Sequence, residues 1–556
     1  MFCPQCGREN PDESKFCQGC GAPLDEQAES AESAAAQPDG GEPQKKLSVA
    51  ALGGALAGKK GARSIVIIAA VALVAIALVI GLIKLIPALF GGGKDAFVYS
   101  TDDHELMFRK SLSAKAEDKE LTDEFADYAI FSEDGKVIYY TDGSSGSSTC
   151  DLYTISVADA GKKNPDPERI DRDVYKWSLD PLKKGGILYE KSGDLYFYDG
   201  KDKNKVAKEC DDYWLDDDEK YIYYTVEGSD YTTSLYRVDY RKGGDKELLL
   251  KDVDGIYSGY DAKTLVFGKS NGDGTCDVYS QKIGGDKSKI VSDVDVPLVA
   301  DTEGGKVRFL YAEHEDYLTY TLKLYNDGTT EKLASDVSGY EYDLESSVYL
   351  YKKDDEWRQN VGGVESKLKL DDDYEIINLF VLGSEAVIEV YDDDYDYHLL
   401  GYKIGKSALE SKGEITDDYS SLSLREDESG KKALYYFQDV NKNGDTGNLI
   451  CYDGKENLIA KEVNAATIYS TGLICTREDE RNGEFTLNIL KKSGEKMKVA
   501  DDVSSFAVLG EKKVLFVMDD DLYLWNGSKN EKLASDVVNV WAPRYARAMF
   551  FRCSSY

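Results

Sequence analysis

Residues 331–337 read EKLASDV, and the same seven residues return at positions 531–537. The two copies begin 200 positions apart, which is five units of about forty residues. At this spacing the chain repeats an apolar, aromatic-rich segment, an acidic or glycine-containing turn, a segment of the type Asp-Leu-Tyr, and a segment that ends near Asp-Val. Four short antiparallel strands in about forty residues are typical of one blade of a β-propeller.

The repeat predicts where the strands of each unit lie. The expected second strands are Val137–Thr141, Ile187–Glu190, Tyr221–Thr225, Leu265–Gly268, Val307–Tyr311, Val348–Tyr351, Ala386–Val390, Leu434–Phe437, Leu473–Thr476 and Val514–Val517. The expected third strands contain Asp151-Leu152-Tyr153, Asp194-Leu195-Tyr196, Ser234-Leu235-Tyr236, Asp277-Val278-Tyr279 and Asp521-Leu522-Tyr523. The expected fourth strands end at Asp173-Val174, Asp252-Val253, Asp293-Val294, Asp336-Val337, Asp502-Val503 and Asp536-Val537.

The region 95–556 is therefore predicted to be all-β, with about eleven blades. Because propellers usually have four to eight blades, the sequence favours two propellers that divide near residues 295–340. One unusually large ring is the alternative. The region opens on a second strand, Phe97–Ser100, and closes on a first strand, Val538–Trp541, and a second strand, Met549–Arg552. This offset predicts that the C-terminus completes the first blade.

The repeat pattern over residues 97–556 resembles the bacterial TolB-like and low-density-lipoprotein-receptor-like propeller families. The resemblance implies a binding platform, and it carries no set of catalytic residues across to this chain. A β-solenoid would use shorter repeats, and a sandwich would not repeat its turns so regularly.

Charge is divided unevenly along the chain. The net charge is −35, with 68 basic and 103 acidic residues. Lysine and arginine balance aspartate and glutamate within residues 1–94, so the repeat region carries the whole excess. A surface this acidic repels nucleic acid and anionic lipid headgroups, so no nucleic acid partner is expected for the repeat region.

Residues 64–83 read SIVIIAAVALVAIALVIGLI, without a charge. At about 1.5 Å per residue, twenty helical residues span the ~30 Å hydrocarbon core of a bilayer, so a transmembrane helix is predicted within residues 64–90. A cleaved signal peptide would have a short leading region, whereas more than sixty residues precede this segment. A buried helix of a globular domain is the other alternative, which so uniformly apolar a stretch disfavours.

Basic residues predict the orientation of this single-pass anchor. Lys45, Lys46, Lys59, Lys60 and Arg63 precede the segment, whereas only Lys84 and Lys94 lie close behind it. Because positive charge stays on the cytoplasmic side, the N-terminus is expected in the cytoplasm and the repeat region outside the cell membrane. Residues 25–63, rich in Ala, Gly, Ser, Glu and Gln, are interpreted as a flexible cytoplasmic linker.

Two pairs of cysteines mark the N-terminus. Residues 3–20 read CPQCGRENPDESKFCQGC, which is C-x2-C, ten residues, and C-x2-C. Such pairs direct four thiolates at one tetrahedral site, and a peptide this short needs the metal to fold. Disulfides are disfavoured in a reducing cytosol, while iron in a four-cysteine site is an alternative to zinc. Four protein thiolates leave no open position, so the zinc is expected to be structural.

The pattern MFCPQCGRENPDESKFCQGCGAPL over residues 1–24 resembles the short zinc-ribbon family found at the N-termini of many bacterial membrane proteins. The resemblance implies that Cys3, Cys6, Cys17 and Cys20 bind zinc. It also implies contacts with other macromolecules, here a cytoplasmic protein that the sequence does not identify.

A second metal site is suggested by residues 439–445, which read DVNKNGD. This stretch fits the opening of a calcium loop, with Asp439, Asn441 and Asn443 as the expected ligands and Asp445 as a further candidate. The acidic residue expected at position 12 of such a loop is absent, because Ile450 stands there. A polar hairpin turn explains the same residues equally well.

Six further cysteines lie in the repeat region, and Cys451 with Cys475 is the pair closest in sequence. Buried thiols are the default expectation for them. The three histidines, His104, His314 and His398, are far apart in sequence, and no known catalytic motif occurs. The sequence therefore predicts a protein that is not an enzyme.

Three functions fit these features. The favoured one is a membrane-anchored binding or scaffold protein whose outer domain recognises a protein, a peptide or a glycan, and whose ribbon contacts macromolecules in the cytoplasm. The first alternative is a transmembrane sensor that relays ligand occupancy to a cytoplasmic partner. The second is an enzyme with an unrecognised site in the propeller channel.

Overall fold

The computed structural model describes residues 95–143, 148–228, 231–295, 299–315, 318–491 and 495–553. All of them belong to one compact unit, residues 90–556. The predicted zinc ribbon, the linker and the membrane segment at residues 64–90 lie outside the described residues. Within the described ranges, no helix is both long enough and apolar enough to span a membrane.

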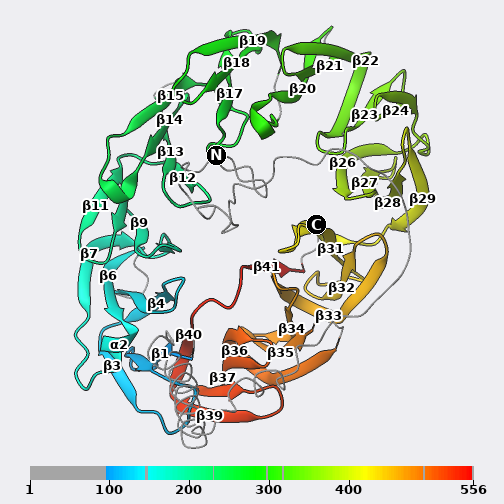
Figure 1. Ribbon diagram of the computed structural model, residues 1–556. Coiled ribbons are helices and arrows are strands. Elements are labelled where there is room, and N and C mark those ends of the chain that lie inside the picture. The colour runs from blue at the N-terminus through cyan, green and yellow to red at the C-terminus, as the bar shows by residue number, and fades with distance from the viewer. Residues whose placement is uncertain are drawn as a thin grey trace, which may run out of the picture. The chain divides into compact units, whose positions relative to one another are not determined.

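The described chain forms a series of antiparallel meanders, which we call blades 1 to 11. Figure 1 shows the order from an inner first strand to an outer fourth strand in blade 4, where it runs from β12 to β15. The prediction of an all-β region with four-stranded units is confirmed. Blade 1 combines both ends of the unit: β40 (Val537–Trp541), β1 (Phe97–Thr101), β2 (Leu106–Arg109) and β3 (Asp118–Thr122).

Blades 2 to 5 are complete four-stranded sheets. Blade 2 consists of β4 (Ala126–Phe131), β5 (Val137–Asp142), β6 (Thr149–Ser156) and β7 (Glu168–Tyr175). Blade 3 consists of β8 (Asp180–Pro181), β9 (Ile187–Lys191), β10 (Asp194–Tyr198) and β11 (Lys203–Ala207). Blade 4 consists of β12 (Asp212–Leu215), β13 (Ile222–Glu227), β14 (Thr233–Val238) and β15 (Glu247–Val253). Blade 5 consists of β16 (Gly255–Ile256), β17 (Thr264–Ser270), β18 (Cys276–Lys282) and β19 (Lys287–Val294).

In several later blades, one long strand serves two neighbours. Blade 6 has β20 (Arg308–His314), β21 (Tyr320–Asn326) and the first half of β22 (Thr329–Asp343), and its inner strand is reduced to a bridge between Asp301 and Arg308. Blade 7 has the second half of β22, β23 (Val348–Lys353), β24 (Glu356–Val361) and β25 (Val364–Lys367). Blade 8 has β26 (Glu375–Leu382), β27 (Glu385–Tyr391), β28 (Tyr397–Ile404) and β29 (Leu409–Thr416).

The last three blades are joined in the same way. Blade 9 has β30 (Ser420–Glu426), β31 (Lys432–Gln438), β32 (Gly447–Tyr452) and the first half of β33 (Glu456–Tyr469). Blade 10 has the rest of β33, β34 (Ile474–Arg481), β35 (Glu484–Leu490) and the first half of β36 (Lys496–Gly510). Blade 11 has the rest of β36, β37 (Lys513–Met518), β38 (Asp521–Trp525) and β39 (Asn530–Ser535). The short helices α2 (Val157–Ala160), η2 (Tyr240–Lys242) and η3 (Glu303–Gly305) lie in connections.

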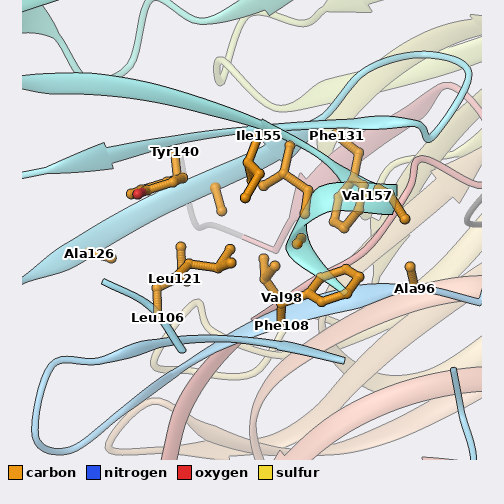
Figure 2. Packing of buried hydrophobic residues seen from close by; sticks show 13 residues of the cluster. Ala96, Val98, Leu106, Phe108, Leu121, Ala126, Phe131, Tyr140, Ile155 and Val157 are labelled. Carbon is orange, nitrogen blue, oxygen red and sulfur yellow. The ribbon is translucent and has the colours of Figure 1, made fainter. Parts of the chain in front are cut away.

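Apolar clusters between neighbouring blades close the series into one ring. Eleven clusters of buried side chains are found among the described residues, and each joins one blade to the next. Figure 2 shows the cluster between blades 1 and 2, where Val98 and Phe108 face Phe131 and Ile155. The cluster between blades 11 and 1 completes the circuit, because Leu515 and Leu522 pack with residues of β1 and β40.

The structure corrects the preference for two propellers that divide near residues 295–340. Apolar packing continues across that region, because Phe309 of blade 6 packs with Val266 and Val278 of blade 5. The closing strand of blade 1 also comes from the far end of the unit, since Tyr99 of β1 lies opposite Val540 of β40. The described residues therefore fit the alternative, one large ring of eleven blades.

Strand alternation explains the repeated Leu-Tyr pair of the third strands. Leu195 is fully buried in the cluster shared with blade 4, whereas Tyr196 packs toward blade 2. Tyr196 also stacks on Tyr189 of the adjacent strand, with ring centroids 5.5 Å apart. Equivalent stacked pairs are Tyr140–Tyr153, Tyr224–Tyr236, Phe267–Tyr279 and Phe516–Tyr523. These cross-strand pairs give part of the chain's many tyrosines a packing role.

The repeated Asp-Val pair forms the same backbone turn at six positions in the chain. At each of six positions the aspartate has a left-handed backbone, with φ between 47° and 60°, and the following valine is fully buried: Asp173-Val174, Asp252-Val253, Asp293-Val294, Asp336-Val337, Asp502-Val503 and Asp536-Val537. Aspartate and asparagine tolerate this conformation better than most residues. The pair therefore bends the outer strand of one blade into the next blade and anchors the bend in the core.

Candidate functional site

The C-terminal segment crosses from blade 1 to blade 10 on the inner side of the ring. After β40 the chain passes through residues 542–547 to β41 (Ala548–Arg552), as Figure 1 shows. β41 pairs antiparallel with the second half of β33, from Ala465 opposite Arg552 to Tyr469 opposite Ala548. It is thus a fifth strand on the inner edge of blade 10. The prediction that Met549–Arg552 is a second strand of the first blade is wrong.

Packing against blades 9 and 10 explains the position of β41. Phe551 is 8% exposed and its ring lies 5.0 Å from that of Phe437 in blade 9, centroid to centroid. Cys553 is also buried, and its backbone N–H donates to the carbonyl oxygen of Asn464 at 2.9 Å. An alternating apolar pattern shows that a strand is buried, but it does not show which edge the strand pairs with.

Ion pairs and ring contacts hold the rest of this segment. Arg544 lies 3.2 Å from Glu133 of blade 2, and Arg552 lies 2.9 Å from Glu480 of blade 10. The ring of Tyr545 meets that of Tyr469 edge-on at 5.7 Å. Both arginines are more than half exposed, so each pair contributes roughly 0–1 kcal/mol to stability.

Two cavities flank residues 541–548. The larger, of about 560 Å³, is walled mainly by apolar and aromatic groups, including Tyr128 and Phe131 of blade 2, Tyr469 of blade 10 and Phe506 of blade 11. Tyr128 also meets the ring of Trp177 at 5.9 Å, and the Trp177 side chain is 73% exposed. This side of the segment therefore offers an aromatic surface.

The smaller cavity, of about 350 Å³, is polar. It is walled by carboxylates of blades 2, 3 and 4, by Lys183, and by Arg544 and Arg547 of the C-terminal segment; the carboxylates are those of Glu133, Asp180, Asp216, Asp217 and Glu219. Burial raises the pKa of Asp180, although the hydroxyl of Tyr213 and the charge of Arg544 act in the opposite direction. A positively charged side chain that entered this cavity would meet more acidic than basic groups.

One of these carboxylates has a structural role. The oxygens of Glu219, only 6% exposed, accept hydrogen bonds from the backbone N–H groups of Lys183 and Lys184, both at 3.0 Å. These bonds tie the first turn of blade 3 to blade 4. Glu219 thereby fixes the wall of the polar cavity.

Arg477 of β34 occupies an aromatic cage beside β41. Its guanidinium carbon lies 4.6, 5.5 and 4.9 Å from the ring centroids of Phe485, Phe506 and Phe550. Burial lowers the pKa of Arg477, because a low-dielectric surrounding disfavours the charged form. Its Nε atom has no hydrogen-bond partner among the described residues. Cation–π contacts of this kind contribute about 0.5–2 kcal/mol each.

The candidate calcium ligands lie in the hairpin between β31 and β32. The side-chain amide of Asn441 donates to Asp445 at 2.7 Å, and that of Asn448 donates to Asp439 at 2.6 Å. These groups therefore satisfy one another in a polar turn, as the alternative interpretation expects, and they give calcium no support. Asn443 lies in the same turn. The described part of the chain holds no group of three His, Cys, Asp or Glu residues arranged for a metal ion.

The predicted zinc ligands Cys3, Cys6, Cys17 and Cys20 lie outside the described residues. Of the cysteines that the structure describes, none forms a disulfide, and Cys451 and Cys475 lie on separate strands, β32 and β34. Burial raises the pKa of Cys475 to about 12, so its thiol stays protonated and unreactive.

The three histidines occupy separate blades. His314 lies 3.0 Å from Asp295, and His398 lies 3.0 Å from Glu414 and 3.4 Å from Asp392. Burial lowers the pKa of His398, but its two carboxylate neighbours outweigh this effect and raise it. These pairs tie turns together, and His104 contacts the ring of Phe125.

Sequence reasoning missed the residues that build this inner site. Arg544, Arg547 and Arg552 fall within ten residues of each other in an otherwise acidic domain, and this local excess of positive charge could have identified the segment. Glu480 and Arg477 carried no such signal, because acidic and basic residues are common on every strand of the repeat.

Comparison with known proteins identifies one domain. Residues 2–24 match the zinc-ribbon domain family, so the chain carries a zinc-ribbon domain at its N-terminus, which implies a structural zinc. The comparison with curated proteins gave no match.

Many solved structures share a general likeness with the chain. The eukaryotic initiation factor in one crystal structure is 10% identical, with a TM-score of 0.36 and coverage of 81% of this chain and 98% of that one. The β-propeller domain of the Trilobed protease from Pyrococcus furiosus is 9% identical, with a TM-score of 0.29 and coverage of 61% and 98%. The tricorn protease is 14% identical, with a TM-score of 0.21. The match covers 76% of this chain, and this chain spans only 45% of the length of the tricorn protease. Likenesses this weak support no inference about activity.

Proposed function

We propose that this chain is a membrane-anchored binding protein whose propeller-like domain holds a segment of a partner protein at the inner strands. The observation that carries the proposal is the pair of cavities beside residues 541–548. Blades 2, 3, 4, 10 and 11 contribute aromatic rings and carboxylates to them, and an extended segment of the chain already lies between. Aromatic anchors with a polar rim are typical of protein interfaces.

Binding fits the chemistry of these cavities better than catalysis does. The described residues that line them include no serine, cysteine or histidine, the side chains on which most nucleophilic catalysis depends. Their groups instead suit contact: flat rings, short apolar side chains and charges of both signs. The proposal therefore gives the domain no catalytic step.

The proposal places the partner outside the cell membrane and a second partner inside. Its support is in the sequence: the uncharged stretch 64–83, the basic residues before it, and the zinc-ribbon domain on the other side. In this arrangement the acidic domain faces away from the negatively charged inner leaflet, and the ribbon meets a cytoplasmic protein.

Site-directed photocrosslinking in intact cells tests the proposal. A benzoylphenylalanine placed at Tyr128 or Tyr545, which line the larger cavity, should give discrete adducts with a partner. The same group at Leu248, 45% exposed on the outer strand β15, is the matched control and should give none of these adducts. Protease treatment should degrade the partner, which distinguishes a protein from a glycan. Identical adducts from Leu248, or adducts that resist protease, would contradict the proposal.

A further inference from the structure

The inner edge of blade 10 shows the form that a bound segment takes. Five residues of β33, Ala465–Tyr469, pair with β41. Because one edge of β33 already pairs with β34, the other edge offers a row of backbone groups that any extended chain can use. Binding of an extended peptide to such an edge is a recurrent mode of recognition, in which side-chain contacts provide the specificity.

Side chains beside this edge contact three consecutive residues of β41, which are Phe550, Phe551 and Arg552. Phe550 lies over the guanidinium of Arg477, at 4.9 Å from the ring centroid, and Arg552 pairs with Glu480 at 2.9 Å. Strand alternation places the residue between them on the opposite face, where Phe551 stacks on Phe437. The edge is thus matched to two adjacent aromatic residues followed by a cation.

From this match we propose that the inner edge of blade 10 is a binding site for an extended peptide of the pattern aromatic–aromatic–cation, and that β41 is its resident occupant. The inference rests on the proposed function and names the chemistry of the partner segment. The partner donates a strand to β33, its first ring covers Arg477, its second ring fills the position of Phe551, and its cation meets Glu480.

The structure also explains how β41 can be exchanged. β41 pairs along one edge only, it is the last strand that the structure describes, and Phe550 is 49% exposed. The Arg552 side chain is 56% exposed. The two cavities on either side of residues 541–548 give the displaced segment room to move. The second and third strands of the four-stranded blades, by contrast, are hydrogen-bonded to a neighbour on each side.

The tether between β40 and β41, residues 542–547, determines how strongly β41 competes with a partner peptide for the edge of β33. Short flexible tethers give effective concentrations in the millimolar range, so a partner peptide must outcompete a strand that is always close. Removing β41 should therefore lower the measured dissociation constant of a free peptide at least tenfold. A partner that binds the intact chain needs further contacts, which the neighbouring cavities supply.

The test uses a fluorescein-labelled synthetic peptide with the sequence of residues 546–556, in which Cys553→Ser prevents disulfide exchange. Fluorescence anisotropy is measured with the purified full chain and with a chain that ends at Arg547. The shortened chain should bind at least tenfold more tightly than the full chain. The shortened chain with Glu480→Lys should bind the peptide at least fivefold more weakly than the shortened chain without this substitution. A peptide that carries Arg552→Glu should recover part of the lost affinity for the Glu480→Lys variant.

Matched controls separate the site from general charge effects. Glu484→Lys makes the same charge change at an exposed residue on the next strand and should leave binding within twofold. Should the shortened chain fail to fold by circular dichroism, the full chain with Arg552→Glu replaces it, because this substitution sets two carboxylates against each other at Glu480. That variant should bind the unmodified peptide more tightly than the unsubstituted full chain does.

The inference would be overturned if the full chain bound the peptide as tightly as the shortened chain or the Arg552→Glu chain does. It would also be overturned if the shortened chain folded but did not bind the peptide. An equal loss of affinity in the Glu480→Lys and Glu484→Lys variants would overturn it too. These outcomes are distinct from failure of the proposed function. Partner adducts at Tyr128 and Tyr545 without peptide binding would reject only the blade 10 site, whereas loss of those adducts would reject the proposed function itself.

Discussion

At the scale of single residues, the repeat predicts one feature that the structure confirms and one that it confirms only in part. Sequence alternation predicts that Leu195 and its equivalents face a neighbouring blade while the following tyrosine faces the other way, and the burial of both agrees. The sequence pattern places each Asp-Val pair at the end of a strand, whereas in the structure β22 and β36 continue past Val337 and Val503. The left-handed aspartate of the pair could not be read from spacing, because the same residues fit an ordinary turn.

Leu195→Ala tests the packing between blades 3 and 4. Leu195 is fully buried, so losing its side chain should lower the free energy of unfolding by about 2–5 kcal/mol. Lys201→Ala, in the exposed turn between β10 and β11, is the control and should change it by no more than about 0.5 kcal/mol. Urea unfolding followed by fluorescence measures both. A Leu195→Ala protein as stable as the control would show that this interface is not packed as described.

Asp502→Val tests the left-handed turn between the outer strand of blade 10 and blade 11. Asp502 is exposed with φ 52°, and a β-branched residue there should cost about 1–2 kcal/mol. Asp502→Asn removes the charge but keeps a side chain that tolerates this backbone, so it should be nearly neutral. Thermal melting of both variants gives the comparison. Equal destabilisation by the two would assign the effect to the charge and not to the backbone.

At the scale of elements, the positions of the strands within a unit could be predicted from the sequence. The strand with which the C-terminal strand β41 pairs could not. The segments expected as second strands appear as β5, β9, β13, β17, β20, β23, β27, β31, β34 and β37. β41 has the same kind of apolar pattern, yet it adds to β33 because Phe551 fits against Phe437. The two EKLASDV copies likewise diverge: β22 continues past Val337, whereas β39 ends before Val537.

The zinc ribbon is a separate element with its own test. A peptide of residues 1–24 should bind one zinc through Cys3, Cys6, Cys17 and Cys20, because four thiolates complete a tetrahedral site. Cys17→Ser should weaken binding by at least tenfold, since three thiolates leave the site open. Metal analysis and titration with a competing chelator measure both quantities. A peptide without stoichiometric metal, or a Cys17→Ser peptide that binds as well, would refute the assignment.

At the scale of the whole molecule, the number of blades could be predicted but not their closure. Repeats of about forty residues give about eleven units by counting. Whether such units form one ring or two depends on small rotations between neighbouring blades, which accumulate around the circuit. The apolar interfaces are alike in composition, so the sequence of one repeat does not distinguish a continuous junction from a division near residues 295–340.

Membrane topology is a second property of the whole chain. Protease added to spheroplasts should digest the region after Lys94 and spare the N-terminal ribbon, because the basic residues before Ser64 predict that this end lies in the cytoplasm. Immunoblots with tags at each terminus report the outcome, and lysed cells provide the control for cleavage of both ends. Protection of the C-terminal tag in intact spheroplasts would reverse the orientation.

Closure of the ring through β1 and β40 is the central claim, because the inner site depends on blades 1, 2, 10 and 11 lying together. Ser100 and Asn539 stand directly opposite each other across these strands. With cysteine at both positions, mild oxidation should link the ends of a single molecule, which runs faster in non-reducing electrophoresis and reverts on reduction. Cysteines in place of Ser100 and Asp301 test the alternative architecture of two propellers, in which the first propeller would close before β20. A disulfide between 100 and 539, and none between 100 and 301, is the predicted result; the reverse would contradict the single ring.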